Sequence, residues 1–291
     1  MLKLYGTKRN ICPVIFRYVT LQASPHTTGM SPKTPWTNSW GSPSSSHGEA
    51  HGISSSSGTS ASQIRSRIDA LVTELSNIYE HPKVLKPFMT DWLERAAAEK
   101  LPADTPEGVK YVEQGCVSLG VRSEARFYHV ESDYYDWSLQ RRCIRLQAPS
   151  ISHLCKSVIM ENTHHNPTGD TLDPTNSKYY CVIVQYVAKL NTQKLINFVY
   201  TMNKSSSKPS SKRDFNLRVA DEALTMTMTG HEQNGVSPIG MKTALPIILS
   251  ESITKLQPPV LFLGGGHVDW KLALPVQDFI DKTRCFVVDT S

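Results

Sequence analysis

Apolar residues recur at steps of three and four along three segments that follow residue 60, which is the pattern of amphipathic helices. Ser60 and Gln63 have the spacing of a capping box at the start of the first segment, and Pro82 ends it. The predicted helices run from Ser60 to the residue before Pro82, from a Thr90 cap through 91–100, and from Thr105 to about Ser118. Together they form a helical extension over residues 61–119.

Beyond residue 120 the pattern changes to short β-branched or aromatic runs that alternate with helical segments. The predicted strands span residues 125–131, 156–161, 179–187, 216–219, 246–249, 260–263, 268–274 and 285–288. The predicted helices span residues 192–202, 221–228 and 275–282, and a polar basic loop covers residues 203–213. This order predicts one mixed α/β (α+β) domain over residues 120–291.

Residues 1–60 lack the apolar residues that a core requires. They hold one acidic residue, Glu49, and eleven serines lie between residues 31 and 60. We expect a disordered leader. Its basic, acid-free start is typical of a mitochondrial transit peptide, and an untargeted tail is the alternative. The protein is therefore expected to be cytoplasmic, or mitochondrial if the leader is a transit peptide.

Composition narrows the classes of partner and cofactor. The net charge of +5 permits an acidic partner such as RNA, although charge alone does not identify one. The six cysteines are scattered without a Cys-x-x-Cys pair, which argues against a structural zinc site and a disulfide framework. No apolar run is long enough for a membrane span. The adjacent His164 and His165 lack a third spaced ligand, so no metal and no cofactor is expected.

Two glycine-rich segments near the end of the chain carry the candidate chemistry: Thr229-Gly230-His231-Glu232-Gln233-Asn234-Gly235-Val236-Ser237-Pro238-Ile239-Gly240 and Leu263-Gly264-Gly265-Gly266-His267-Val268-Asp269-Trp270-Lys271-Leu272. Glycine allows backbone to approach another group closely, and proline stiffens a loop. Backbone N–H groups held this way can stabilise an oxyanion. The simpler interpretation of each segment alone is a tight connection between two elements.

Three segments in order resemble the YbaK family, which includes the editing insertion of bacterial prolyl-tRNA synthetases. They are His153-Leu154-Cys155-Lys156-Ser157-Val158-Ile159, the Thr229–Gly240 loop followed by Leu245-Pro246-Ile247-Ile248, and Leu261–Leu272. The resemblance covers about residues 120–285. It implies a mixed sheet or partly closed barrel with flanking helices. It also implies hydrolysis of the ester of mischarged tRNA without a metal, with a synthetase as a further candidate partner and no role for DNA.

The resemblance also assigns roles to individual residues. The family's strand lysine falls on Lys156, where an ammonium suits the 3′-terminal phosphate or the ester region. Its Gly-x-x-x-Pro loop falls on Gly235 to Gly240, including Ser237 and Pro238, whose backbone is expected to hold the aminoacyl carbonyl. Asp269 is a candidate for binding the α-amino group, and turn capping is its alternative role. The remaining expected substrate contacts are Ser157, His231, Gly264, Gly265 and Gly266.

Two of these positions depart from the family pattern, with Ser157 for a usual threonine and His231 for a usual aromatic residue. No histidine or acid pairs with Ser237 in the nearby sequence, so a Ser-His-Asp triad is rejected. The aromatic segment Tyr134-Tyr135-Asp136-Trp137 is a candidate pocket wall, with core packing as the alternative for Trp137. The competing function is a non-catalytic tRNA- or synthetase-binding module that keeps the fold.

Overall fold

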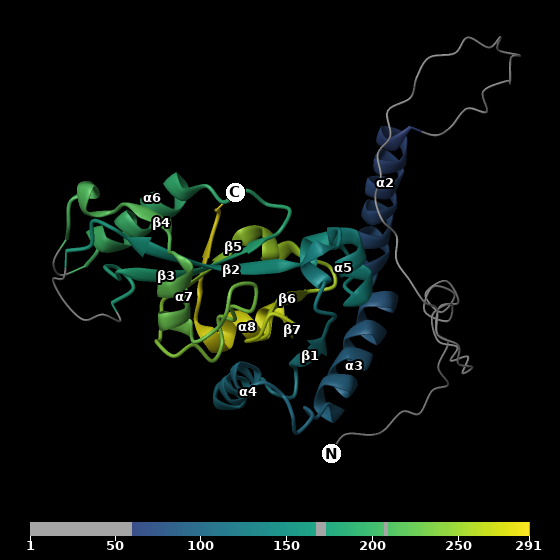
Figure 1. The fold of residues 1–291 in the computed structure, drawn as a ribbon. Coiled ribbons are helices and arrows are strands. Elements are labelled where there is room, and N and C mark those ends of the chain that lie inside the picture. The colour runs from purple at the N-terminus through teal and green to yellow at the C-terminus, as the bar shows by residue number, and fades with distance from the viewer. Residues whose placement is uncertain (1–59, 167–172, 207–208, 291) are drawn as a thin grey trace, which may run out of the picture. The chain divides into compact units, whose positions relative to one another are not determined.

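The computed structural model describes residues 60–166, 173–206 and 209–290, and residues 58–291 form one compact unit (Figure 1). The predictions for the leader therefore lie outside the described residues. The division between a helical extension and a domain at residue 119 stays a prediction.

The first described helix, α2 (Ala61–Glu80), begins as expected. The Ser60 side chain accepts from the Gln63 N–H, and the Gln63 side chain accepts from the Ser60 N–H, so the capping box is confirmed. The prediction for the second helix is wrong in its start. Helix α3 (Pro82–Ala98) begins at Pro82, where the His81 side chain caps it.

Thr90 lies inside α3 rather than at its cap, and its hydroxyl donates to the carbonyl of Lys86. Proline fits the first turn of a helix because its missing N–H has no partner there anyway. Pro82 therefore starts α3 more than two turns before the expected cap. The third helix, α4 (Glu107–Leu119), agrees with the prediction and ends at Gly120, whose φ is +69°.

The strands belong to two sheets. One has the order β1-β7-β6 and is antiparallel throughout. The other has the order β4-β2-β3-β5-β8, with β5 parallel to both β3 and β8. The strands are β1 (Arg126–His129), β2 (Cys155–Asn162), β3 (Tyr179–Gln185), β4 (Leu217–Val219), β5 (Ile247–Ser250), β6 (Val260–Gly264), β7 (Trp270–Pro275) and β8 (Phe286–Val288).

The helices around these strands are α5 (Leu139–Arg145), α6 (Thr192–Lys204), α7 (Glu222–Thr229) and α8 (Val276–Thr283). The 3-10 helices are η2 (Tyr134–Asp136), η3 (Ile151–His153), η4 (Lys212–Asp214) and η5 (Glu251–Lys255). Helix α5 and the 3-10 turns are absent from the sequence prediction, because segments of three to seven residues hold too few apolar repeats to show a period. The expected basic loop at 203–213 includes the end of α6 and the first two residues of η4.

The predicted fold class is confirmed: the chain is a mixed α+β protein with two sheets and flanking helices. Among the described residues neither sheet closes into a barrel, and an isolated parallel bridge between Leu154 and Phe262 links the segment before β2 to β6. This bridge lies at the entry to β2. It sets the candidate lysine strand beside the glycine-bearing strand β6.

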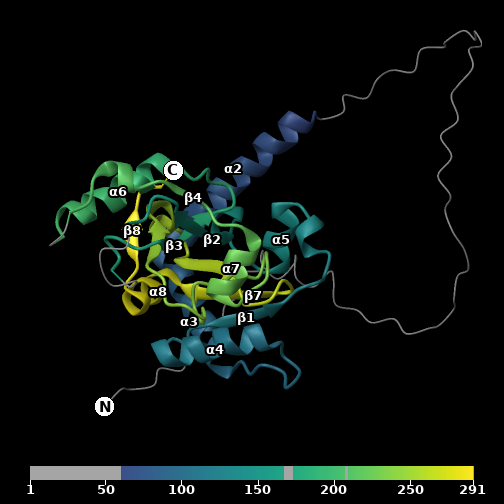
Figure 2. The ribbon, with the colours of Figure 1, turned by 60° about the vertical axis from the view of Figure 1, so that its left-hand side comes forward.

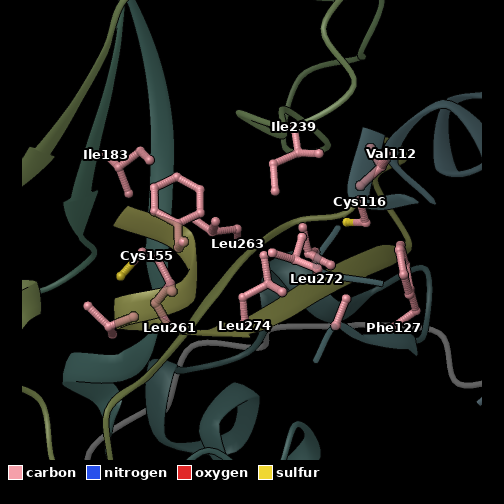
Figure 3. Close-up of a cluster of buried hydrophobic side chains, with 14 of the residues drawn as sticks. Val112, Cys116, Phe127, Cys155, Ile183, Ile239, Leu261, Leu263, Leu272 and Leu274 are labelled. Atoms are coloured by element: carbon pink, nitrogen blue, oxygen red, sulfur yellow. The ribbon is translucent and has the colours of Figure 1, made fainter. Parts of the chain in front are cut away.

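The largest core lies between the two sheets and α4. Apolar side chains from β6 and β7 meet Val112 and Cys116 of α4 and Ile239 of the glycine-rich loop (Figure 3). Figures 1 and 2 show α4 next to the three-stranded sheet. Helix α3 packs on the same sheet through a second cluster of hydrophobic side chains, in which the Trp92 ring meets the Phe262 ring edge-on. Two helices from before residue 120 thus support the strands that hold the candidate site.

Candidate functional site

A cavity of about 370 Å³ lies where the two sheets meet. Its wall comes from β2, η2, the start of α7, and the neighbouring ends of β6 and β7. Tyr186, just after β3, and Gln233, Asn234 and Val236 of the glycine-rich loop complete it. A volume of this size is in the range of small-molecule sites. Three of the expected catalytic and substrate-binding residues line it: Lys156, Ser157 and Gly264.

Strand β2 presents an open edge to the cavity. The carbonyl of Ile159 accepts from the N–H of Ala220 at 2.8 Å, just beyond β4. Backbone groups two residues apart in a strand point to the same edge, so the N–H and C=O of Ser157 point to this edge as well. The Ser157 hydroxyl is buried and has no hydrogen-bond partner among the described residues. This part of the wall therefore offers polar groups to a ligand.

Lys156 stands on the same strand with its side chain exposed. Its Nζ lies 5.8 Å from the centre of the Tyr186 ring. Among the described residues no carboxylate forms an ion pair with it. A hydrated, unpaired ammonium beside an aromatic ring is suited to an anionic group that arrives from solvent.

The two glycine-rich segments are pressed against each other. The N–H of Gly266 donates to the carbonyl of Gly235 at 2.8 Å. A Cβ on Gly264 would lie 2.3 Å from the carbonyl oxygen of Val236. Only glycine permits such an approach. The loop therefore reaches the cavity through Val236, which lines it together with Gly264.

The same segments also lie against α4. A Cβ on Gly240 would meet the Tyr111 carbonyl oxygen at 2.5 Å, and one on Gly266 would meet the Gly108 carbonyl oxygen at 2.3 Å. Both glycines have positive φ, +75° and +93°. Close approach of backbone was expected from the sequence, but with a ligand. In the structure, these glycines meet a helix.

Ser237 and His231 hold the loop from inside. Ser237 is fully buried, and its hydroxyl accepts from the N–H of Ile239 at 3.2 Å. The His231 Nδ1 accepts from the backbone N–H of Ser237 at 3.2 Å. Burial lowers the pKa of His231 to about 4. This histidine bonds to the backbone rather than to the hydroxyl of Ser237, in agreement with the rejection of a catalytic triad.

Lys271 is the functional candidate that the sequence reasoning missed. It lines the cavity from β7 and is only 4% exposed, the one buried lysine or arginine whose side chain the structure describes. Its Nζ donates to the carbonyls of Val268 at 2.5 Å and Trp270 at 3.3 Å. Burial lowers its pKa to about 7, although the nearby Asp269 charge opposes this shift. A single lysine inside the apolar run of β7 was the available signal.

Two tyrosines of η2, Tyr134 and Tyr135, flank Lys271 and belong to the cavity wall. Its Nζ lies 5.1 Å from the centre of the Tyr134 ring and 4.7 Å from that of Tyr135. The Tyr135 hydroxyl donates to the Asn234 carbonyl at 2.5 Å and so fastens η2 to the loop. Trp137 instead packs against a hydrophobic cluster, which confirms the alternative for that residue.

The remaining predicted site residues lie outside the cavity lining. They are Gly235, Ser237, Pro238, Gly240, His231, Gly265, Gly266 and Asp269. The backbone of Asp269 is used in the turn, where its carbonyl accepts from the Val130 N–H at 2.8 Å. The roles expected for these residues stay predictions. In the part of the chain that is described, no cluster of three metal-ligating side chains occurs, and no helix is long and apolar enough to cross a membrane.

Comparison with solved structures gives a fold-level match. A candidate trans-editing enzyme for prolyl tRNA synthetase superposes with a TM-score of 0.50 at 16% sequence identity, covering 65% of this chain and 99% of that one. The fold is YbaK-like. A scaffold protein from computational epitope grafting (TM-score 0.49, 16% identity, 64% and 98% coverage) and a hypothetical protein (0.46, 15%, 62% and 98%) are also similar. No protein-family model and no curated protein matches the chain.

Proposed function

We propose that this protein is an aminoacyl-tRNA deacylase that hydrolyses the ester of mischarged tRNA. The observation that carries the proposal is the cavity, which brings Lys156 and Ser157 of β2 together with Val236 and Gly264 of the two glycine-rich segments. The fold shared with a candidate trans-editing enzyme supports the same reaction.

In the proposed mechanism, the exposed ammonium of Lys156 binds the 3′-terminal phosphate of the tRNA. The open β2 edge at Ser157 and the loop at Val236 position the aminoacyl carbonyl. A water molecule, or the thiol of a cysteinyl substrate, attacks the carbonyl carbon. The bond from that carbon to the ribose oxygen then breaks, and the ribose oxygen takes up a proton. Placement and oxyanion stabilisation supply the acceleration.

A deacylation panel tests this proposal. The purified protein is incubated with Ala-, Cys-, Ser-, Pro-, Asp- and Glu-tRNA, each on the tRNA for proline and on one other tRNA, and release of free amino acid is measured. We expect turnover of at least one substrate above the rate of spontaneous hydrolysis. No turnover of any by folded protein would refute the proposal.

The second candidate function is a non-catalytic module that binds tRNA or a synthetase. It is favoured by the position of Gly235, Pro238 and Gly240 outside the cavity lining, because the resemblance expects this loop to hold the aminoacyl carbonyl. Such a module would bind deacylated and aminoacylated tRNA alike and leave the ester intact. Binding without hydrolysis across the panel would select it.

A further inference from the structure

The β7 side of the cavity carries a buried cation without an ion-pair partner, on which Asp269 acts only from beyond ion-pair distance. Among the described residues no carboxylate lies within ion-pair distance of the Lys271 Nζ. Its known hydrogen-bond partners are two neutral backbone carbonyls. Removing an ammonium from water is unfavourable unless an opposite charge compensates it. An anion that binds in the cavity would therefore stabilise the charged form of Lys271.

The surroundings of Lys271 favour a compact anion. Its Nζ lies against the rings of Tyr134 and Tyr135, and the apolar side chains of Leu146 and Phe262 line the same cavity. A solvated phosphodiester is better served by Lys156, because that side chain is exposed. A carboxylate on a short flexible chain fits the buried position, since it can accept a charge-assisted hydrogen bond from the remaining Nζ hydrogen.

We propose that Lys271 makes the cavity selective for an acyl group that carries a side-chain carboxylate, so that the preferred esters are aspartyl- or glutamyl-tRNA. This inference rests on the proposed function for the nature of the ligand. Lys271 is then a specificity-determining residue, and Lys156 is left to bind the nucleic acid.

Binding of stable analogues tests the inference without any need for turnover. The probes are 3′-deoxyadenosines that carry a glutamyl or a glutaminyl group in amide linkage at the 3′ position. The two probes differ only at the end of the amino-acid side chain, which is a carboxylate in one and an amide in the other. Neither probe contains a phosphate. Affinities are measured by calorimetry at pH 6.5 with the full chain. We expect the glutamyl analogue to bind at least about tenfold more tightly, because a charge-assisted hydrogen bond is the difference.

The variant Lys271→Met removes the charge and keeps an unbranched apolar chain. We expect it to bind the two analogues within about twofold of each other, whereas Lys83→Met on the exposed face of α3 keeps the wild-type ratio. Equal binding by the wild type, no binding of either analogue, or an unchanged ratio in Lys271→Met would overturn the inference. Selective binding without hydrolysis of any aminoacyl-tRNA would keep the inference and refute the proposed function instead.

Discussion

Lys156 and Lys271 line the same cavity from different sheets, and the protein holds them in opposite ways. Lys156 is exposed on a strand with an open edge, so its ammonium stays in contact with solvent. Lys271 is buried between tyrosine rings and backbone carbonyls, and burial lowers its pKa to about 7. The charge on the exposed Lys156 costs little stability, whereas the buried Lys271 opposes folding when it is charged. Substitution of Lys156 on β2 is therefore expected to change function without changing stability, whereas substitution of Lys271 on β7 is expected to change both.

The largest expected effect is on activity at the β2 wall. We expect Lys156→Ala to lower the deacylation rate at least about a hundredfold, because the substrate phosphate loses its cation, with no change in thermal unfolding. The measurement is single-turnover hydrolysis of the best panel substrate. Lys83→Ala, which also removes an exposed lysine, serves as the control. Activity retained in Lys156→Ala would remove Lys156 from the mechanism.

On the side of the cavity formed by β6 and β7, we expect substitutions to lower the free energy of unfolding. Gly266→Ala places a Cβ 2.3 Å from the Gly108 carbonyl oxygen at a φ of +93°. We expect a loss of about 2 to 3 kcal/mol in the free energy of unfolding, measured by urea denaturation. Gly120→Ala is the matched control, because Gly120 has a φ of +69° with nothing within 4 Å, and about 1 kcal/mol is expected. Equal losses in the two variants would show that the contact with α4 is loose.

The pH dependence of stability sharpens the contrast between the lysines. The folded-state pKa of Lys271, about 7, lies below its ordinary value of 10.5. Between these values the unfolded chain binds one more proton than the folded chain, so stability rises with pH across this window. From pH 7 to pH 9 we expect the wild type to gain about 2 kcal/mol relative to Lys271→Met.

This comparison is measured by urea denaturation at the two pH values. The charged groups around Lys271 are Asp269, Arg142, Glu222 and Lys156, and they are present in both proteins. Their own contributions therefore largely cancel in the difference. A constant difference between wild type and variant would contradict the lowered pKa.

The smallest effect on stability is expected from the hydrogen bond that joins η2 to the glycine-rich loop. Tyr135→Phe removes the hydroxyl that donates to the Asn234 carbonyl at 2.5 Å. We expect a loss of about 1 kcal/mol in unfolding free energy, the usual contribution of one hydrogen bond. Tyr111→Phe on α4 is the control, because the Tyr111 side chain is exposed. If both variants unfold alike, the bond between η2 and the loop contributes little.

The periodicity of apolar residues, together with capping residues, glycines and prolines, was sufficient to predict most of the fold. The capping box at Ser60, the stop at Gly120 and the core strands follow from local rules, with boundary shifts of one or two residues. The prediction of a helix start at Thr90 is wrong because a threonine hydroxyl can also donate to a carbonyl one turn earlier within a helix. The Thr90 hydroxyl donates to the Lys86 carbonyl in this way. Single-sequence reasoning has no means to choose between a cap and such a bond.

The site was predicted only in part, for a different physical reason. Lys156, Ser157 and Gly264 line one cavity, because strand order alone brings them together. Glycine signals a close approach without naming the group approached, and for Gly240 and Gly266 that group is α4. The helix carried its own signal, since Gly108 and Gly115 lie seven residues apart and therefore on one face.

The contact between α4 and the glycine-rich segments also determines how this protein can be dissected. Gly108 and Gly115 allow the helix backbone to support both loops that border the cavity. A fragment that starts at residue 120 would keep every strand and every lining residue, yet its loops would lose their support. Minimal active fragments should therefore begin upstream of Glu107. Searches for shorter relatives should ask whether they keep an equivalent glycine-bearing helix.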